Sequence, residues 1–144
     1  MILYFDTSAL VKLFSDEAGS ESVKQLVNNP SNEVIVLELA LIEILSAVYR
    51  KVRNNEIEEA KLEKIKVAID QQFDYFTVIP MASDVVAESK TLIDSFGKNY
   101  GLRTLDALHI GGWNVAAEPS WKFVSSDNNQ LTVVEKLNAQ TIAV

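Results

Sequence analysis

Four acidic residues stand out in this sequence because each lies beside or within an apolar segment. Acidic side chains that gather in one cleft repel one another, and some of their pKa values rise unless a cation neutralises the charge. Mg²⁺ or Mn²⁺ would do so with a few carboxylates and several waters, which leave room for a phosphate oxygen and an attacking hydroxide. Such a cluster predicts metal-assisted hydrolysis of phosphodiester bonds. The four residues are Asp6, Glu43, Asp106 and Asp127.

Two of these acids follow predicted strands. Residues 2–5 form an apolar run without alternation, which is typical of a strand buried on both faces of a parallel sheet, and Asp6 follows at once. Residues 121–124 are predicted as another strand, which leads through two serines to Asp127. Open α/β sheets bind ligands at the carboxyl edge of their strands, so we expect both acids there. Each acid could instead simply cap the helix that follows it.

Glu43 is the least expected acid, because it is the only charged residue between positions 39 and 49. A helix that is apolar nearly all round is expected to be buried. An unpaired carboxylate in such a helix is costly or stays protonated, so a cation or a hydrogen-bond donor should lie close to it. The alternative interpretation is that Glu43 pairs with Arg50 or extends to the edge of the helix.

Asp106 opens the apolar helix that is predicted from residue 102 or 103 to residue 117. An acid in the first turn also interacts favourably with the helix dipole, and this alone could explain its position. Capping and dipole effects explain each acid singly. These effects do not readily explain why four carboxylates occur together, two of them after strands and two on apolar helices.

The other segments alternate between strands and helices. This alternation predicts an α/β fold: a three-layer α/β/α sandwich with a mainly parallel central sheet of about five strands. The length of 144 residues and the hydrophobic content of 48% fit one domain, residues 1–144. Ser83 is expected as an N-cap and Gly97 as a helix stop, and close packing is expected to explain Gly111 and Gly112. Predicted strands are 2–5, 34–37, 75–79, 121–124 and 141–144, and predicted helices are 10–14, 21–28, 38–53, 57–74, 83–96, 102–117 and 129–137.

Composition narrows the chemistry further. The chain has no cysteine and one histidine, which argues against thiolate sites, disulfides and a histidine-rich zinc site, so any metal should be held by oxygen. No apolar run approaches the roughly 18 residues of a membrane span, and Met1 to Phe5 lacks the features of a signal peptide, so we expect a cytoplasmic protein. The net charge of −7 argues against broad electrostatic binding of nucleic acid, unless basic residues cluster, metal ions add positive charge or a basic partner binds.

At these residues the sequence resembles the PIN-domain nucleases, and more narrowly the VapC toxins of bacterial and archaeal toxin–antitoxin modules. The resemblance runs nearly from end to end. It implies a PIN-like fold and a metal-dependent endoribonuclease in which Asp6, Glu43, Asp106 and Asp127 bind Mg²⁺ or Mn²⁺ and cut RNA. It also implies a homodimer and inhibition by a cognate antitoxin. The motifs are Phe5-Asp6-Thr7-Ser8-Ala9-Leu10, Glu43, Leu105-Asp106-Ala107-Leu108-His109-Ile110 and Phe123-Val124-Ser125-Ser126-Asp127-Asn128.

Other polar residues near these motifs are candidates for supporting roles. Thr7 and Ser8 could hydrogen-bond Asp6 or a phosphate, or could be ordinary capping groups. Ser125 stands where many family members have threonine, and it keeps the hydroxyl. Arg103 could contact RNA phosphate or pair with an acid. His109 could be a general base, but a single histidine among apolar residues is more often packed and hydrogen-bonded.

Charge clusters and other phosphate chemistries offer further interpretations. The basic residues of 50–53 are a candidate for RNA or partner contact, although a solvated helix end is the simpler account. A haloacid-dehalogenase-type phosphatase would need a second aspartate where this chain has Ser8, and a response-regulator receiver would need an adjacent acidic pair that is absent. The remaining alternative is a PIN-like domain that binds RNA or a partner without cutting.

Overall fold

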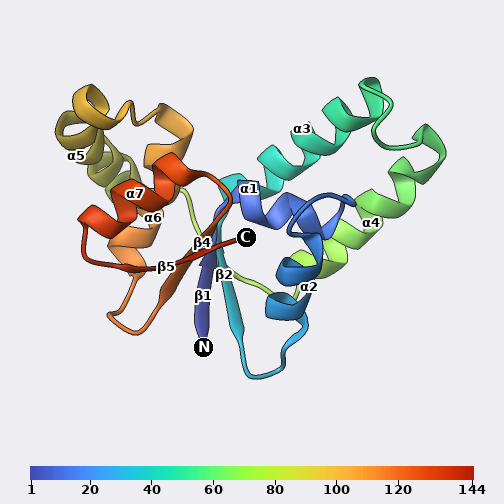
Figure 1. The fold of residues 1–144 in the computed structure, drawn as a ribbon, viewed down its shortest axis with the longest axis horizontal. Coiled ribbons are helices and arrows are strands. Elements are labelled where there is room, and N and C mark those ends of the chain that lie inside the picture. Colours follow the sequence, from blue (N-terminus) through green and yellow to red (C-terminus); the bar gives the residue numbers. More distant parts are fainter.

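A five-stranded, wholly parallel sheet forms the centre of the computed structural model, which describes residues 1–144 (Figure 1). The strand order is β3-β2-β1-β4-β5, so β1 lies in the middle between β2 and β4. In that register Phe5, the last residue of β1, pairs with Val36 and with Val124. The strands are β1 (Ile2–Phe5), β2 (Glu33–Leu37), β3 (Thr77–Ile79), β4 (Lys122–Ser125) and β5 (Gln140–Ala143).

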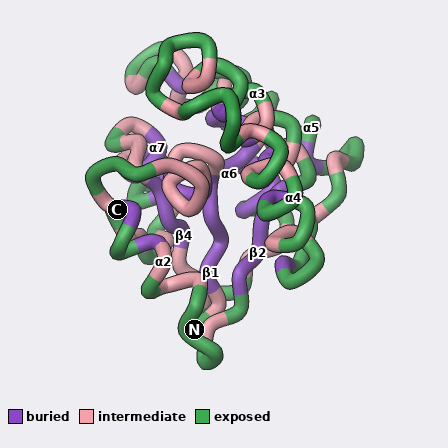
Figure 2. Tube along the Cα trace, turned by 90° about the vertical axis from the view of Figure 1, so that its right-hand side faces the viewer, coloured by how far each residue is buried: buried purple, intermediate pink, exposed green.

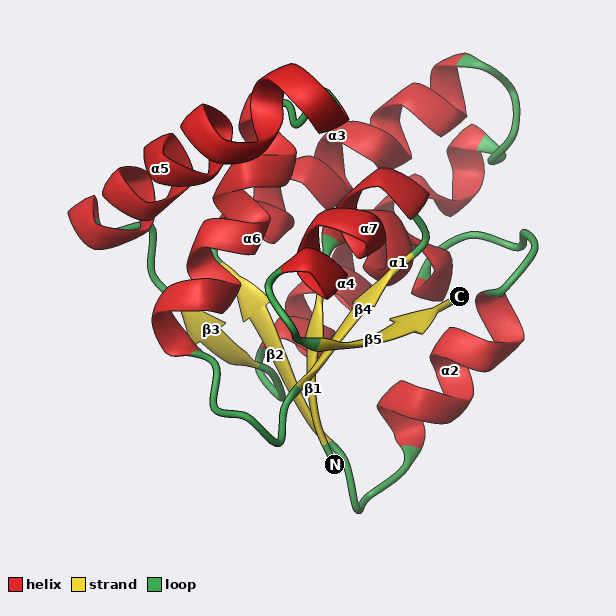
Figure 3. Ribbon diagram, turned by 60° about the vertical axis from the view of Figure 1, so that its left-hand side comes forward, coloured by secondary structure: helices red, strands yellow, loops and turns green.

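Helices cover both faces of the sheet, and the predicted three-layer sandwich with a parallel sheet is confirmed (Figure 3). Side chains alternate along each strand, so Leu3 and Phe5 point into one apolar cluster while Tyr4 points into the other. The first cluster packs against α1 to α4, and the second packs against α5 to α7. The helices are α1 (Thr7–Leu10), η1 (Val11–Leu13), α2 (Ser20–Asn28), α3 (Leu39–Arg53), η2 (Glu59–Lys61), α4 (Leu62–Phe73), α5 (Ser83–Tyr100), α6 (Thr104–Ala116) and α7 (Asn128–Lys136).

The two glycines in α6 allow this helix to pack closely against its neighbours, as predicted. A Cβ atom at Gly111 would collide with the Ser89 hydroxyl on α5. At Gly112 it would lie 2.8 Å from Leu37 and from the Tyr4 hydroxyl, both on strands of the sheet. Because α6 is held this close to the sheet, its first turn is fixed near the carboxyl ends of the strands.

Some sequence predictions at helix ends were wrong. Gly97 does not stop α5, which continues to Tyr100 and ends at Gly101, whose positive φ of 62° a glycine adopts without steric cost. Ser83 is the first residue of α5 rather than its N-cap; the cap position is Ala82, which offers no side-chain hydrogen bond. The helix predicted from residue 57 is divided between η2 and α4.

The expectation that α3 is buried all round was also wrong. Only Ala40, Ile44 and Val48 are buried, and they form one stripe that packs on the sheet, whereas Ile42 and Tyr49 are exposed. Figure 2 shows the buried residues concentrated in the strands and along the inward sides of the helices. No helix of this fold combines the length and the apolar character that a bilayer crossing requires.

Candidate active site at the carboxyl edge of the sheet

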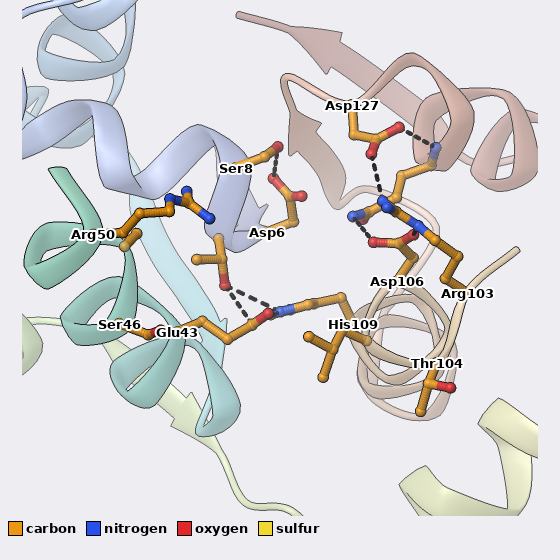
Figure 4. A pocket seen from close by; sticks show the side chains of 14 residues that line it. Asp6, Ser8, Glu43, Ser46, Arg50, Arg103, Thr104, Asp106, His109 and Asp127 are labelled. Atoms are coloured by element: carbon orange, nitrogen blue, oxygen red, sulfur yellow. Dashed lines mark hydrogen bonds and ion pairs between the residues drawn. The ribbon is translucent and has the colours of Figure 1, made fainter. Parts of the chain in front are cut away.

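A cavity of about 600 Å³ opens where β1 and β4 end, between α3 and the first turn of α6. All four acids singled out in the sequence line it, although they come from four separate segments (Figure 4). The strand order explains two of them, because β1 and β4 are neighbours and bring Asp6 and Asp127 to the same edge. The cavity is therefore acidic.

Asp6 is both a helix cap and a buried carboxylate. Its Oδ1 atom accepts hydrogen bonds from the backbone N–H of Ala9 (3.0 Å) and from the Ser8 hydroxyl (2.9 Å), so the capping interpretation is also correct. Only 1% of Asp6 is exposed. Burial raises the pKa of Asp6 above its ordinary value, and neither these hydrogen bonds nor the charge of a protonated His109 offsets the burial fully.

Glu43 does find the donors that its apolar surroundings require. Thr7 Oγ1 donates to Glu43 Oε1 (2.7 Å), and His109 Nε2 lies 2.5 Å from the same oxygen and 3.1 Å from Thr7 Oγ1. Burial raises the pKa of Glu43, but the hydrogen bonds from His109 and Thr7, with the charge of a protonated His109, outweigh it and hold the pKa below its ordinary value. Glu43 does not pair with Arg50.

His109 is packed and hydrogen-bonded, as the sequence favoured, but its partner belongs to the cavity. The ring is 2% exposed, and its Nδ1 atom is buried without a hydrogen-bond partner. A proton on Nδ1 would be buried without an acceptor, so the neutral ring carries its proton on Nε2. His109 therefore donates from Nε2 to Glu43.

Asp106 and Asp127 are held together by one arginine. Arg103 Nε lies 2.9 Å from Asp106 Oδ2, and Arg103 Nη2 lies 3.6 Å from Asp127 Oδ2, although 75% of the arginine side chain is exposed. The hydrogen bond to Asp106 and the negative charges of Asp106 and Asp127 raise the pKa of Arg103 above its ordinary value, so the guanidinium stays charged. Asp127 also caps α7 by accepting from Asn129 N (2.8 Å) and Gln130 N (3.2 Å).

Gln130 belongs to the site, and the sequence analysis did not single it out. It is 3% exposed, and its Nε2 atom donates to Asp106 Oδ1 at 3.1 Å. Its Oε1 atom is buried and has no partner. The only signal for it in the sequence is its position three residues after Asp127, on the same face of α7.

The two serine candidates support the loops rather than the cavity centre. Ser125 is fully buried, does not line the cavity, and accepts a hydrogen bond from Asp127 N at 2.9 Å. Ser8 accepts from Ser126 N at 3.0 Å and lies 3.3 Å from Ser125 Oγ. These contacts join α1 to the end of β4 and to the residue after it, so they fix the spacing between Asp6 and Asp127.

The donor set suits a hard divalent cation, since the acids offer carboxylate oxygens and Gln130 Oε1 is a buried acceptor without a partner. As the side chains lie here, however, no three histidine, aspartate or glutamate residues come close enough together to hold a metal ion. Arg103 supplies positive charge between Asp106 and Asp127 in this arrangement.

Comparison with known proteins gives one consistent result. Residues 3–137 match the family model of the PIN domain. Ribonuclease VapC45 of Mycobacterium tuberculosis is 24% identical over 118 residues, which cover 82% of this chain and 78% of that protein.

Two solved structures show the same fold. VapBC2 from Rickettsia felis, bound to a DNA fragment from its promoter, has a TM-score of 0.69 at 13% identity and covers 100% of this chain and 99% of that one. A toxin–antitoxin complex from Klebsiella pneumoniae has a TM-score of 0.61 at 15% identity, with 90% and 89% covered.

Proposed function

Because this chain belongs to the PIN domain family, we propose that it is a metal-dependent endoribonuclease, the toxin of a toxin–antitoxin pair. The observation that carries this proposal is the convergence of four carboxylates from four separate segments on one cavity. The relative named as a ribonuclease supports RNA as the substrate. The bond that it would hydrolyse is the phosphodiester bond of RNA.

We assign the cation to these four acids. Asp6 and Asp106 are its principal ligands, directly or through water, and Glu43 and Asp127 complete the site and orient the attacking water. A bound Mg²⁺ or Mn²⁺ would supply a hydroxide near neutral pH and stabilise the charge that develops on the phosphate. The raised pKa of Asp6 supports this assignment, because a buried carboxylate without a cation is the group that a divalent ion would stabilise most.

The other residues hold the acids in position. His109 and Thr7 both contact Oε1 of Glu43, which leaves Oε2 without a side-chain partner. Gln130 fixes Asp106 in the same way. Arg103 keeps Asp106 and Asp127 from repelling each other, and it becomes available to a phosphate when a metal ion takes over that task.

The partners of the protein follow from its family and its fold. The toxin–antitoxin complex from Klebsiella pneumoniae shares the fold and supports a cognate antitoxin as an inhibitory partner. We also propose a homodimer in the cytoplasm, where cellular RNA is available, and a single PIN domain over residues 1–144. Size-exclusion chromatography with light scattering tests the dimer.

A second function is favoured by one observation. Arg103 joins Asp106 and Asp127, and no three acids are grouped tightly enough to hold an ion. This arrangement favours a PIN-like domain that binds RNA or a partner protein without cutting.

Cleavage of RNA by the purified protein separates the two functions. We expect Mg²⁺ or Mn²⁺ to be required, EDTA to stop cleavage, and Asp6→Asn to be inactive while its circular dichroism spectrum is unchanged. Asparagine keeps the oxygen that caps α1, so the fold should survive. Cleavage in EDTA, or full activity of Asp6→Asn, would refute the nuclease assignment. RNA binding without cleavage in any metal would establish the second function.

A further inference from the structure

Arg50 lines the cavity, and the proposed function leaves it without a role. It lies on α3 seven residues after Glu43, and Ser46 and Ala47 lie between them at the helical spacing that places all four on one face. All four line the cavity, so this face of α3 forms one of its walls. Figure 4 shows Arg50 and Arg103 on opposite sides of the acids.

The charge of Arg50 is not neutralised by any acid. Its guanidinium forms no ion pair and no side-chain hydrogen bond, and it is exposed. Arg103, the other arginine of the cavity, contacts two acids. Lys51, the next residue along α3, is held by Glu17 and Glu56 at 3.5 and 3.3 Å. Arg50 is therefore the one cation at the cavity whose charge is free for a ligand.

The position of Arg50 on the helix indicates which phosphate it can reach. Seven residues of α-helix span about 10 Å, so the backbone of Arg50 lies about 10 Å farther along α3 than the backbone of Glu43. Between them Ser46 and Ala47 have small side chains, which leave this wall of the cavity open. Positively charged grooves bind single-stranded RNA along its backbone, and a guanidinium can bind two phosphate oxygens at once.

We propose that Arg50 binds a phosphate that flanks the scissile one, so that the RNA strand runs along α3 from Glu43 toward Arg50. This inference rests on the proposed function, because it takes RNA as the ligand. It also gives a chain with a net charge of −7 one local positive contact for the RNA backbone, in addition to the metal ion that the acids would bind.

The salt dependence of RNA binding tests this subsite directly. Arg50→Gln and the matched control Arg53→Gln remove the same charge from the same helix, but Arg53 does not line the cavity. Both are made in the Asp106→Asn background, so that RNA is not cut, and binding is measured by fluorescence anisotropy over a range of KCl concentrations. We expect Arg50→Gln to weaken binding about tenfold and to reduce the slope of log affinity against log salt by about 0.7, the value for one lost phosphate contact on a single strand.

The outcomes are distinguishable. Equal affinity and equal slope for Arg50→Gln and Arg53→Gln would overturn the subsite, even if the natural protein cuts RNA. If the natural protein neither binds nor cuts RNA, the proposed function fails, and the subsite fails with it. Arg50 is exposed and unpaired, so Arg50→Gln should unfold at the same temperature as the control, and a difference in binding then reports the contact itself.

Neutral phosphates locate the contact on the RNA. In a series of short RNAs, each with one methylphosphonate, one substitution beside the cut site should weaken binding about tenfold when Arg50 is present and have no further effect on Arg50→Gln. If every methylphosphonate weakens both proteins by the same factor, no phosphate contacts Arg50 and the proposal is wrong.

Discussion

The two halves of the cavity hold their carboxylates in different ways. The histidine half consists of Asp6, Thr7, Glu43 and His109, where donors from the protein interior hold the acids. The arginine half consists of Arg103, Asp106, Asp127 and Gln130, where an exposed guanidinium bridges two acids. Solvent screens the charge of an exposed arginine, so Arg103 can be displaced at little cost, whereas the buried histidine cannot. The histidine half is therefore a fixed part of the site, and the arginine half is an exchangeable one.

The largest expected effect comes from removing one acid from each half. If both halves belong to one metal site, Glu43→Gln and Asp127→Asn should each reduce the rate of RNA cleavage by more than about 100-fold, because changes to residues that only support metal ligands already cost about 10- to 100-fold. Initial cleavage rates with Mg²⁺ measure this, and Glu118→Gln, an exposed acid outside the cavity, is the control. If either variant keeps the natural rate, its half is not part of the catalytic site.

A smaller effect is expected from His109, which acts through Glu43. His109→Ala should reduce kcat about 10- to 100-fold with little change in KM, because Glu43 loses its buried donor. In His109→Gln the side-chain amide can donate to Glu43, so this variant should recover part of the activity. If His109 were instead an indispensable general base, glutamine would be as inactive as alanine, and that result would contradict a positioning role.

A further test concerns Arg103, the positive charge that a metal ion would displace. Arg103→Gln should bind Mn²⁺ about two- to fivefold more tightly, since the metal no longer competes with the guanidinium for Asp106 and Asp127. Titration calorimetry measures this affinity, and Lys98→Gln removes an equal charge outside the cavity. Weaker Mn²⁺ binding by Arg103→Gln would mean that the arginine supports the metal site rather than substitutes for the ion.

The smallest effect is the pH dependence of stability that Asp6 confers. Its folded-state pKa is raised, so the folded protein holds this proton more strongly than the unfolded chain, and stability is lost as pH rises through that window. Without metal, Asp6→Asn should raise the thermal midpoint of unfolding at neutral pH, because the asparagine cannot ionise. The gain should disappear below the ordinary aspartate pKa. An equal gain at both pH values would mean that ionisation of Asp6 is not its cause.

Local sequence patterns predicted most of the fold. The uninterrupted apolar run before Asp6 indicated a buried parallel strand, and β1 is the central strand of the sheet. The end of α5 was misjudged because Gly97 and Gly101 look alike in sequence, and only the backbone conformation at Gly101 distinguishes them. The pattern of α3 misled because its exposed apolar residues, such as Ile42, are indistinguishable by type from its buried ones.

The partners of the site residues could not be predicted in the same way. That Glu43 required a donor followed from its apolar surroundings, but His109 as the donor depends on the packing of α6 against the sheet, 66 residues away in sequence. Gln130 on α7 donates to Asp106 on α6, which lies 24 residues away in sequence. Periodicity assigns residues to elements, whereas long-range contacts are set by how those elements pack.

Thermal unfolding with and without Mg²⁺ tests the central claim most directly, because it requires neither an RNA substrate nor an antitoxin. A ligand that binds only the folded state stabilises it, by about 2.7 kcal/mol at a concentration 100 times its Kd. We predict that Mg²⁺ or Mn²⁺ raises the unfolding midpoint of the natural protein beyond the effect of NaCl at equal ionic strength. The control Glu118→Gln should respond as the natural protein does, and Asp6→Asn should respond much less. If neither ion raises the midpoint of the natural protein, or if Asp6→Asn responds as fully, these acids do not form a metal site.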